Sequence, residues 1–218
     1  DKKYNVLSLD NNLTIDNLLL SGLFTYFRQK PFSKVPDYSS KPKSIFISTM
    51  PTEPFAMDYE YLIDSDDSFI QDGIDSLNKL FDCPIYINSK PDSKFLKLDN
   101  VIHNTFNKLH PSGNIGIQIH KINPIKDKDD TRWYLSLQDL NRIGEFFKTG
   151  TYNNYKYLSI GGNGSNKPAI YKYLIGTRVN DITKIESSEN INIISGDVLN
   201  GKITSIDHSI GYYDEVLS

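Results

Sequence analysis

The sequence predicts an α/β protein in two parts, and three observations lead to that prediction. An apolar strand pattern at residues 44–49 is followed by a helix pattern at 69–81 and a second strand pattern at 84–87. Strand, helix and strand in that order favour a right-handed parallel crossover. A segment rich in glycine and small polar residues follows at 161–166. After it come short strand patterns around one brief helix pattern.

The first part, residues 1–160, is expected to open with a helix. Thr14 is a good N-cap, and the apolar residues after it form a helical stripe that Gly22 interrupts and Pro31 ends. The apolar run at 44–49 has a proline on either side, which is typical of a short buried strand.

The next elements continue this α/β pattern. Asp66 or Ser68 can cap the helix at 69–81, whose apolar positions recur on one face. The strand at 84–87 follows directly. Weak alternation of apolar and polar residues at 101–106 indicates a further strand.

A charged run at 126–130 is expected to be a solvated loop before a strand-like segment at 133–135. The apolar spacing of Leu140, Ile143, Phe146 and Phe147 predicts one more helix, which ends near Gly150. A strand pattern at 155–160 closes the first part.

We place the domain boundary after residue 160. Strand patterns at 169–174, 191–194 and 202–206, with a short helix near 179–182, suit a small β-grasp-like module over residues 161–218.

Composition excludes several classes of protein. The 218 residues carry a formal charge of −3 without a basic stripe, so we expect no nucleic-acid partner. Cys83 is the only cysteine, which excludes an intramolecular disulfide and an iron–sulfur cluster held by several thiolates of this chain, and fits a reducing compartment. No apolar run approaches the ~20 residues that span a bilayer. The chain does not begin with Met, and we expect it to be a piece of a longer polypeptide.

The segment 21–36 stands out because it lies where a nucleotide-binding fold would place its phosphate loop. A phosphate loop needs glycines so that backbone N–H groups can approach the anion. Gly22 is the only glycine here, and aromatic and basic side chains take the place of the others. Aromatic side chains beside Arg and Lys are typical of protein interfaces and of pockets for flat ligands. Packing of the three phenylalanines in the core is the alternative. The candidate residues are Phe24, Phe27, Arg28, Phe32 and Lys34.

The remaining motifs favour structural roles. Gly161–Gly164 follows a strand, but Pro168 and another strand pattern come next, so we interpret it as a linker rather than a phosphate loop. Three of the four histidines, His103, His110 and His120, lack metal-ligand spacing, and we predict no metal site.

Two acidic clusters are also interpreted as structural, and we predict no catalytic residue. Asp64, Asp66 and Asp67 match only fragments of a calcium loop and suit a helix start better. Glu53, Asp58 and Glu60 have no nucleophile or base partner in the sequence and are expected on a solvated surface. Ser21 and Ser195 lack the frame of a nucleophile elbow.

An ordered series of short segments runs through most of the chain. It begins with Ser-Gly-Leu at 21–23 and Arg-x-x-Pro-Phe-Ser-Lys-Val-Pro at 28–36. It continues with Ser44–Met50, Glu53-Pro54, Phe69–Gly73, His110–Gly113, Trp133-Tyr134, Gln138-Asp139, Ile143–Gly150, Gly161-Gly162, Asn166–Pro168 and Ile194–Gly201. In this order and spacing the chain resembles NqrA, a subunit of the Na+-translocating NADH:quinone reductase. The resemblance implies the middle of NqrA, without its N-terminal and C-terminal parts.

The resemblance also implies a fold. The NqrA family is similar to the flavin- and NADH-binding subunit of respiratory complex I and to RnfC of the Rnf electron-transport complex. It implies a Rossmann-like parallel-sheet domain at 1–160 and a β-grasp, ubiquitin-like domain at 161–218. Those relatives place a glycine-rich flavin loop where this chain has 23–35, and they carry iron–sulfur cysteines that a single Cys83 cannot supply. The resemblance therefore implies a scaffold that has lost its redox cofactors.

The function that the resemblance implies is that of a cofactor-free, peripheral scaffold and docking part of a sodium-pumping NADH:quinone oxidoreductase. The family places it on the cytoplasmic face of the bacterial inner membrane, against integral membrane and other subunits, with no membrane span of its own. FMN, FAD and iron–sulfur clusters are then expected only in partner subunits. Ubiquinone is a candidate ligand, with Phe24, Phe27, Arg28, Phe32 and Lys34 as the partner-facing or quinone-facing residues.

Two alternatives remain open at this point. One is an independent oxidoreductase that binds flavin or NADH, against which the missing glycine loop counts. The other is a β-grasp half that acts as a small-ligand binding module.

Overall fold

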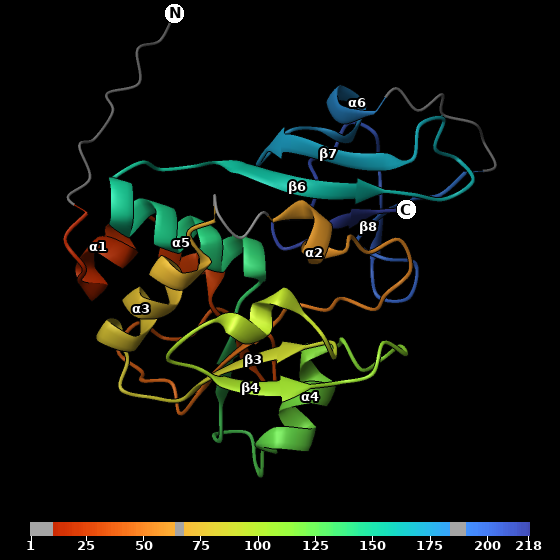
Figure 1. Cartoon of the computed structure of the whole chain (residues 1–218). Helices are drawn as coiled ribbons and strands as arrows, with labels where there is room; N and C mark the ends of the chain where they lie inside the picture. The colour runs from red at the N-terminus through yellow and green to blue at the C-terminus, as the bar shows by residue number, and fades with distance from the viewer. Residues whose placement is uncertain (1–10, 64–67, 184–190) are drawn as a thin grey trace, which may run out of the picture.

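The computed structural model describes residues 11–63, 68–183 and 191–218, and Figure 1 shows their arrangement. The first region holds a group of helices beside one sheet, and the second region lies above them as a smaller sheet. Asp64, Asp66 and Asp67, which the sequence suggested as a helix start, lie outside the described residues.

The first sheet has the strand order β1-β5-β2-β3-β4. Strands β5, β2, β3 and β4 run parallel, and β1 pairs antiparallel with β5 at the edge. The parallel pairing of β2 with β3 confirms the crossover that the sequence predicts. The strands are β1 (Arg28–Lys30), β2 (Ile45–Ser48), β3 (Ile85–Ser89), β4 (Ile102–Thr105) and β5 (Arg132–Tyr134).

Helices α3 and α5 pack closely, and two glycines make this possible. A Cβ atom at Gly144 would lie 2.0 Å from the carbonyl oxygen of Phe69, and one at Gly73 would lie 2.5 Å from that of Leu140. Figure 1 shows α1, α3 and α5 together, with α4 apart from them beside β4. The helices of this region are α1 (Ile15–Leu20), α2 (Tyr59–Leu62), α3 (Ile70–Leu80), α4 (Ile115–Ile122) and α5 (Leu137–Thr149), with 3-10 turns η1 (Leu23–Tyr26) and η2 (Lys94–Lys97).

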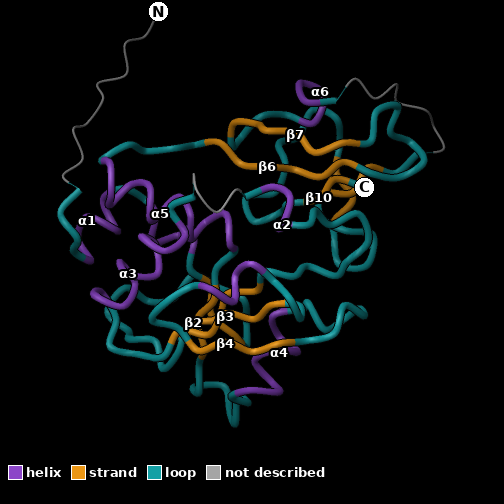
Figure 2. The backbone as a smooth tube through the Cα atoms, viewed as in Figure 1, coloured by secondary structure: helices purple, strands orange, loops and turns teal. Residues whose placement is uncertain are grey.

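The second region is built around β6 (Tyr155–Ile160). It pairs antiparallel with β7 (Ala169–Leu174) and parallel with β10 (Val216–Leu217). Strands β8 (Ile193–Ser195) and β9 (Lys202–Thr204) form a further antiparallel pair. Two backbone hydrogen bonds between Ile194 and Ser218 join β8 to the end of β10. The short helix α6 (Val179–Ile182) follows β7. Figure 2 shows the strands of this region gathered around β10.

Three sequence predictions need correction. The first helix ends at Leu20 rather than near Pro31, because Gly22 adopts a left-handed φ of 76° and η1 and β1 follow. Helix α3 has Phe69 as its N-cap, and the backbone N–H of Phe69 donates to the side chain of Asn141, so Ser68 does not cap it.

The third correction concerns one end of the charged run at 126–130, in which residues 126–129 are exposed as predicted. Asp130 is buried and accepts hydrogen bonds from Arg132 and Lys43, so this end of the loop is not solvated. The charged network instead ties the loop to the start of β2.

Two apolar cores differ greatly in size. Among the described residues, the core of the first region has 23 buried apolar residues grouped around Trp133, Phe27 and Ile47. The core of the second has seven: Leu158, Ile160, Tyr173, Val179, Ile193, Ile210 and Leu217. Strand β6 contributes to the second core, so the predicted boundary after residue 160 falls at the end of a strand of the second sheet.

Candidate functional site

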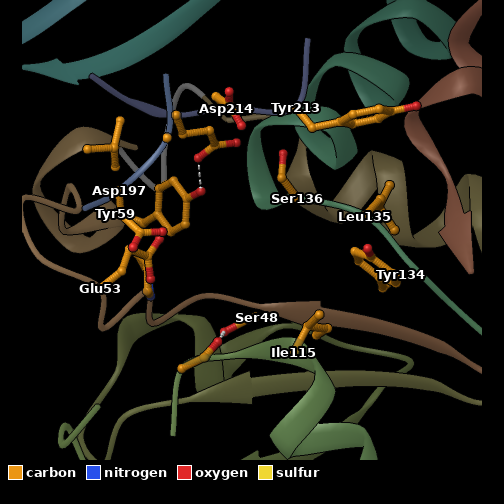
Figure 3. A pocket seen from close by; sticks show the side chains of 15 residues that line it. Ser48, Glu53, Tyr59, Ile115, Tyr134, Leu135, Ser136, Asp197, Tyr213 and Asp214 are labelled. Atoms are coloured by element: carbon orange, nitrogen blue, oxygen red, sulfur yellow. Dashed lines mark hydrogen bonds between the residues drawn. The ribbon is translucent and has the colours of Figure 1, made fainter. Parts of the chain in front are cut away.

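A cleft of about 250 Å³ lies at the carboxyl ends of β2 and β5, where the first and second regions meet. The chain leaves β2 toward β3 and β4 and returns to β5 on the other side of β2, so the strand order reverses between these two strands. Open parallel sheets bind ligands at this switch point. Figure 3 shows the cleft and the side chains around it. Its lining includes Ser48, Glu53, Tyr59, Gly113, Ile115, Tyr134, Leu135, Ser136, Asp197, Tyr213, Asp214 and Glu215.

The chain leaves β2 through residues 49–54, which border the cleft at this edge of the sheet. This stretch contains two prolines, which have no N–H, and Glu53, whose carboxylate lines the cleft. A phosphate site needs several free backbone N–H groups. The segment 21–36 forms η1, the edge strand β1 and the loop after it. Because β1 is antiparallel to β5 and Arg28 pairs with Tyr134, the start of β1 lies at the same carboxyl edge of the sheet.

One side of the cleft is acidic. Glu53, Asp197, Asp214 and Glu215 line it, and the hydroxyl of Tyr59 donates to the carboxylate of Glu215. Burial, more than its acidic neighbours, raises the pKa of Glu53. Burial and then the charge of Glu215 hold the pKa of Tyr59 well above its usual value, so this hydroxyl stays a donor.

A buried lysine offsets part of this negative charge. The ammonium of Lys156, on β6, lies 3.6 Å from Glu215 Oε1, and the Lys156 side chain is 1% exposed. Asp214 accepts a hydrogen bond of 2.7 Å from the hydroxyl of Ser195. The acidic side of the cleft is thus held by strands of the second region.

The other side of the cleft is aromatic and basic. Tyr134 and Tyr213 lie across from Glu53 in Figure 3. The guanidinium carbon of Arg28 lies 4.4 Å from the ring centre of Tyr213, and Lys30 Nζ lies 5.7 Å from that of Tyr134. These are cation–π distances. Burial, and then the charge of Arg28, lowers the pKa of Lys30. A flat ligand with an electron-rich or anionic edge fits this side better than the acidic one.

The five residues predicted as one surface do not lie together on one. Phe24 and Phe27 are buried in the first core, where they pack against Trp133, so the core-packing alternative applies to them. Because both rings pack against the indole of Trp133, neither of them contributes to an exposed surface. Phe32 is 65% exposed and Lys34 is exposed. Arg28 is half-buried at the rim of the cleft.

Arg28 also holds the loop that follows it. Its Nε and Nη2 atoms donate to the carbonyl oxygen of Ser33 at 3.0 and 2.6 Å. Of the predicted segment, Arg28 and Lys30 lie against Tyr213 and Tyr134, two tyrosines that line the cleft, whereas Phe32 and Lys34 belong to the exposed loop beyond β1.

The residues that sequence reasoning missed come from a short segment near the end of the second region. Tyr213 donates to the carbonyl oxygen of Thr25 at 2.9 Å, and the hydroxyls of Tyr212 and Thr25 lie 2.9 Å apart. The hydroxyl of Tyr59 also donates to Glu215, so residues 212–215 connect the two regions by side-chain hydrogen bonds. We call this segment the latch. In the sequence this segment is marked only by two adjacent tyrosines followed by two acidic residues. That pattern does not show which residues of the first region they contact.

Other candidates take structural roles. Asp58 caps α2 and pairs with Lys90 at 2.9 Å, and Glu60 accepts a hydrogen bond from Ser93. Asp58 is exposed as predicted, whereas Glu53 and Glu60 are half-buried, so the prediction of a solvated acidic surface needs correction for these two. Burial raises the pKa of the Cys83 thiol to about 11, which makes it a weak nucleophile at neutral pH.

The histidines and the glycine-rich segment also have structural partners. His103 contacts the carbonyl oxygen of Leu98 at 2.8 Å, and the Nδ1 atom of His110 lies 3.4 Å from Thr52. Gly161–Gly164 leads into strand β7 rather than a helix, as predicted, and borders a second, largely apolar cavity of about 270 Å³ next to β8.

No helix among residues 11–63, 68–183 and 191–218 has the length and apolar character needed to cross a membrane.

Comparison with known proteins gives consistent matches. A family model described as the NqrA second alpha/beta domain matches residues 9–152. The relatives that match are NqrA subunits, named for the Na+-translocating NADH-quinone reductase. That of Marinomonas sp. (strain MWYL1) is 35% identical over 196 residues, which are 89% of this chain and 44% of the relative. That of Glaesserella parasuis serovar 5 is 36% identical over 222 residues, which are 97% of this chain and 49% of the relative. The chain spans about half the length of these curated relatives.

The likeness to solved structures supports the fold alone. A chain in the crystal structure of an NAD+-reducing [NiFe]-hydrogenase in the air-oxidized state matches with a TM-score of 0.55 at 9% identity. The match covers 98% of this chain and 47% of that one. A distant structure therefore has a similar fold over nearly the whole of this chain.

Proposed function

This chain belongs to the NqrA family of the Na+-translocating NADH-quinone reductases, through its second α/β domain, and from that premise we propose that it is a peripheral scaffold and docking part of such a complex. The observation that carries the proposal is the family match over residues 9–152 together with relatives of that name over most of the chain. The proposed place is the cytoplasmic face of the bacterial inner membrane, against the integral membrane and other subunits.

We also propose that this part of NqrA holds no flavin, NADH or iron–sulfur cluster, and that FMN, FAD and the clusters reside in partner subunits. The switch-point cleft supports this. Residues 49–54 offer prolines instead of a phosphate-binding loop, and Glu53, Asp197 and Asp214 on one side repel the phosphates of a dinucleotide. A flavin- or NADH-binding enzyme is the candidate that this cleft disfavours.

The finer fold assignment belongs to the same proposal. The parallel strands β5, β2, β3 and β4 suit a Rossmann-like domain. In the second region, β6 is parallel to β10 and antiparallel to β7, with α6 after the hairpin, which suits a β-grasp domain. Since β6 pairs within the second sheet, we propose that the domain boundary lies in the segment 150–154 rather than after residue 160.

Quinone contact is proposed for the aromatic side of the cleft. Tyr134 and Tyr213 present flat rings, and Arg28 and Lys30 supply donors beside them. A quinone head group needs a flat apolar slot with one or two hydrogen-bond donors. The predicted residues Phe32 and Lys34 lie on the neighbouring exposed loop and are assigned to docking.

Two measurements test the proposal. Saturation-transfer NMR on the purified chain with FMN, NADH and a short-chain ubiquinone is expected to show transfer to ubiquinone alone. Transfer to FMN or NADH would overturn the cofactor-free assignment. Tyr213→Leu is expected to remove the ubiquinone signal, whereas Tyr61→Leu, a change at an exposed tyrosine of α2 outside the cleft, leaves it intact.

Assembly tests the docking role. In the complex that contains this chain, Phe32→Ala is expected to weaken binding to the partner subunits about tenfold, the effect of removing one aromatic anchor. If Arg28→Ala and Phe32→Ala leave both assembly and quinone reduction unchanged, the docking and quinone assignments are wrong.

A further inference from the structure

The loop of residues 31–43, which joins β1 to β2, exposes three large apolar side chains. Phe32 is 65% exposed, Val35 is 39% exposed and Tyr38 is 68% exposed. Pro36 and Pro42 between and beside them are buried, so the loop is anchored to the body of the protein at these points. Exposed apolar side chains gathered on one short segment mark an interaction site.

The loop is held in shape by its own hydrogen bonds. Arg28 donates twice to the carbonyl oxygen of Ser33, and the backbone N–H of Gln29 donates to the carbonyl of Lys34 at 2.8 Å. Farther along, the carboxylate of Asp37 accepts from the backbone N–H of Ser39 at 2.9 Å. The apolar side chains are therefore presented by an ordered backbone, which lowers the entropy lost on binding.

The charge of the loop is opposite to that of the rest of the chain. Three lysines and one aspartate give residues 31–43 a formal charge of +2, whereas the whole chain carries −3. Lys34 and Lys41 are exposed, and the carboxylate of the single acid, Asp37, is occupied within the loop by Ser39. Lys43 pairs with Asp130 at 2.7 Å, but Asp130 also binds Arg132, so this trio keeps one positive charge.

We propose that this loop binds an anionic lipid surface, with Phe32, Val35 and Tyr38 entering the head-group layer and Lys34 and Lys41 contacting lipid phosphates. Aromatic side chains favour the membrane interface, and lysines near it are attracted by anionic lipids. A stable protein interface uses about 20–30 residues a side, so the loop alone is too small for one, and contact with lipid adds to the proposed docking on partner subunits rather than replacing it. One short loop suits a fluid surface that adapts to it.

Vesicle binding tests the proposal without any partner subunit, so it can fail while the proposed assembly stands. The purified chain is sedimented with vesicles of phosphatidylcholine alone and with vesicles that contain one quarter phosphatidylglycerol. We expect binding to the anionic vesicles, a much weaker signal on the neutral ones, and loss of binding as salt screens the charges.

Loop variants separate the two contributions. Lys34→Gln and Lys41→Gln are each expected to weaken binding about fivefold, because a lysine near an anionic surface contributes about 1 kcal/mol. The double variant Phe32→Ala with Tyr38→Ala is expected to lose at least tenfold. Tyr61→Ala and Lys148→Gln, at exposed positions outside the loop, serve as matched controls that keep binding.

Two results would overturn the proposal. Equal binding of the wild-type chain to neutral and anionic vesicles, or no binding to either, removes the lipid assignment. Loss of binding to isolated partner subunits in the loop variants, with no vesicle binding by the wild-type chain, assigns the loop to an acidic protein surface instead. Circular dichroism of each variant confirms that its fold is intact before these results are read.

Discussion

The first and second regions of the molecule are stabilised in different ways. Within the described part of the chain, the first packs 23 apolar residues around one tryptophan, whereas the second packs seven beneath a small sheet. Small cores stabilise little on their own, because the entropy of ordering the chain grows with every residue. The second region therefore relies on its contacts with the first.

Some of those contacts lie in the latch of residues 212–215, and Gln138 of α5 adds two hydrogen bonds to the backbone of Tyr157 in β6. Tyr212 and Tyr213 hydrogen-bond to Thr25, and Glu215 binds Tyr59 of the first region and faces Lys156 of the second. Three residues that line the candidate cleft, Tyr59, Tyr213 and Glu215, therefore also help to hold the smaller region in place.

The largest effect is expected in the first core. Trp133 is fully buried and contacts the rings of Phe24, Phe27 and Phe81 at centroid distances of 5.5–5.8 Å. Trp133→Ala should lower the free energy of unfolding by about 3–5 kcal/mol, because it opens a cavity among rings that cannot collapse into it. Urea unfolding followed by circular dichroism measures this loss.

A matched change in the second core sharpens the contrast. Leu158→Ala also removes a fully buried side chain, but hydrogen exchange should rise in β6, β7 and β10 while β2 and β3 stay protected. Equal loss of protection in both regions would mean that they unfold as one unit, and the comparison would fail.

The next effect concerns the latch. Glu215→Gln removes the charge that faces Lys156 and leaves a buried ammonium without its counter-ion, since the Lys156 side chain is 1% exposed and that of Glu215 is 15% exposed. We expect a loss of about 2–3 kcal/mol in the free energy of unfolding, somewhat below the usual cost of breaking a fully buried pair.

The exposed pair between Lys148 and Asp72 provides the control. Lys148→Gln should cost less than about 1 kcal/mol, as exposed pairs do. If the two substitutions have equal effects in thermal unfolding, Glu215 is not a special contact between the regions.

The smallest effect is a pH dependence at Glu53. Burial raises the pKa of its carboxyl in the folded state, so the ionised form costs stability above that pKa. The cost disappears as the pH falls below the ordinary pKa of glutamate. Glu53→Gln should therefore raise Tm by about 1–3 °C at pH 8 and leave it unchanged at about pH 3.5. Thermal scans at the two pH values measure this, and an equal shift at both would contradict it.

The helices and strands were largely predictable where the spacing of apolar residues and the capping residues close by in the sequence determine them. Helix α5 follows its apolar spacing and ends at Gly150, which takes the left-handed φ of 74° that terminates helices. Strand β6 has the predicted bounds, and those of β2, β3 and β4 differ from the predicted ones by one or two residues. Each of these elements is set by residues close to one another in the chain.

The site was less predictable because distant segments build it. Phe24 and Arg28 are four residues apart, yet one packs on Trp133 and the other stacks on Tyr213. Burial of an aromatic residue depends on what the rest of the chain places around it, and spacing alone does not distinguish core from surface. The partner of Tyr59 is 156 residues away, which no local pattern reveals.

The position of β10 has a consequence for synthesis of the protein on the ribosome. This strand lies between β6 and β8, so the pairs β6–β7 and β8–β9 are not joined until residues 216–217 have left the exit tunnel. The strands and the tryptophan core of the first region are complete by residue 152, well before that point. Because domains fold in order as they emerge, the large region can serve as a finished template on which the nascent small one assembles.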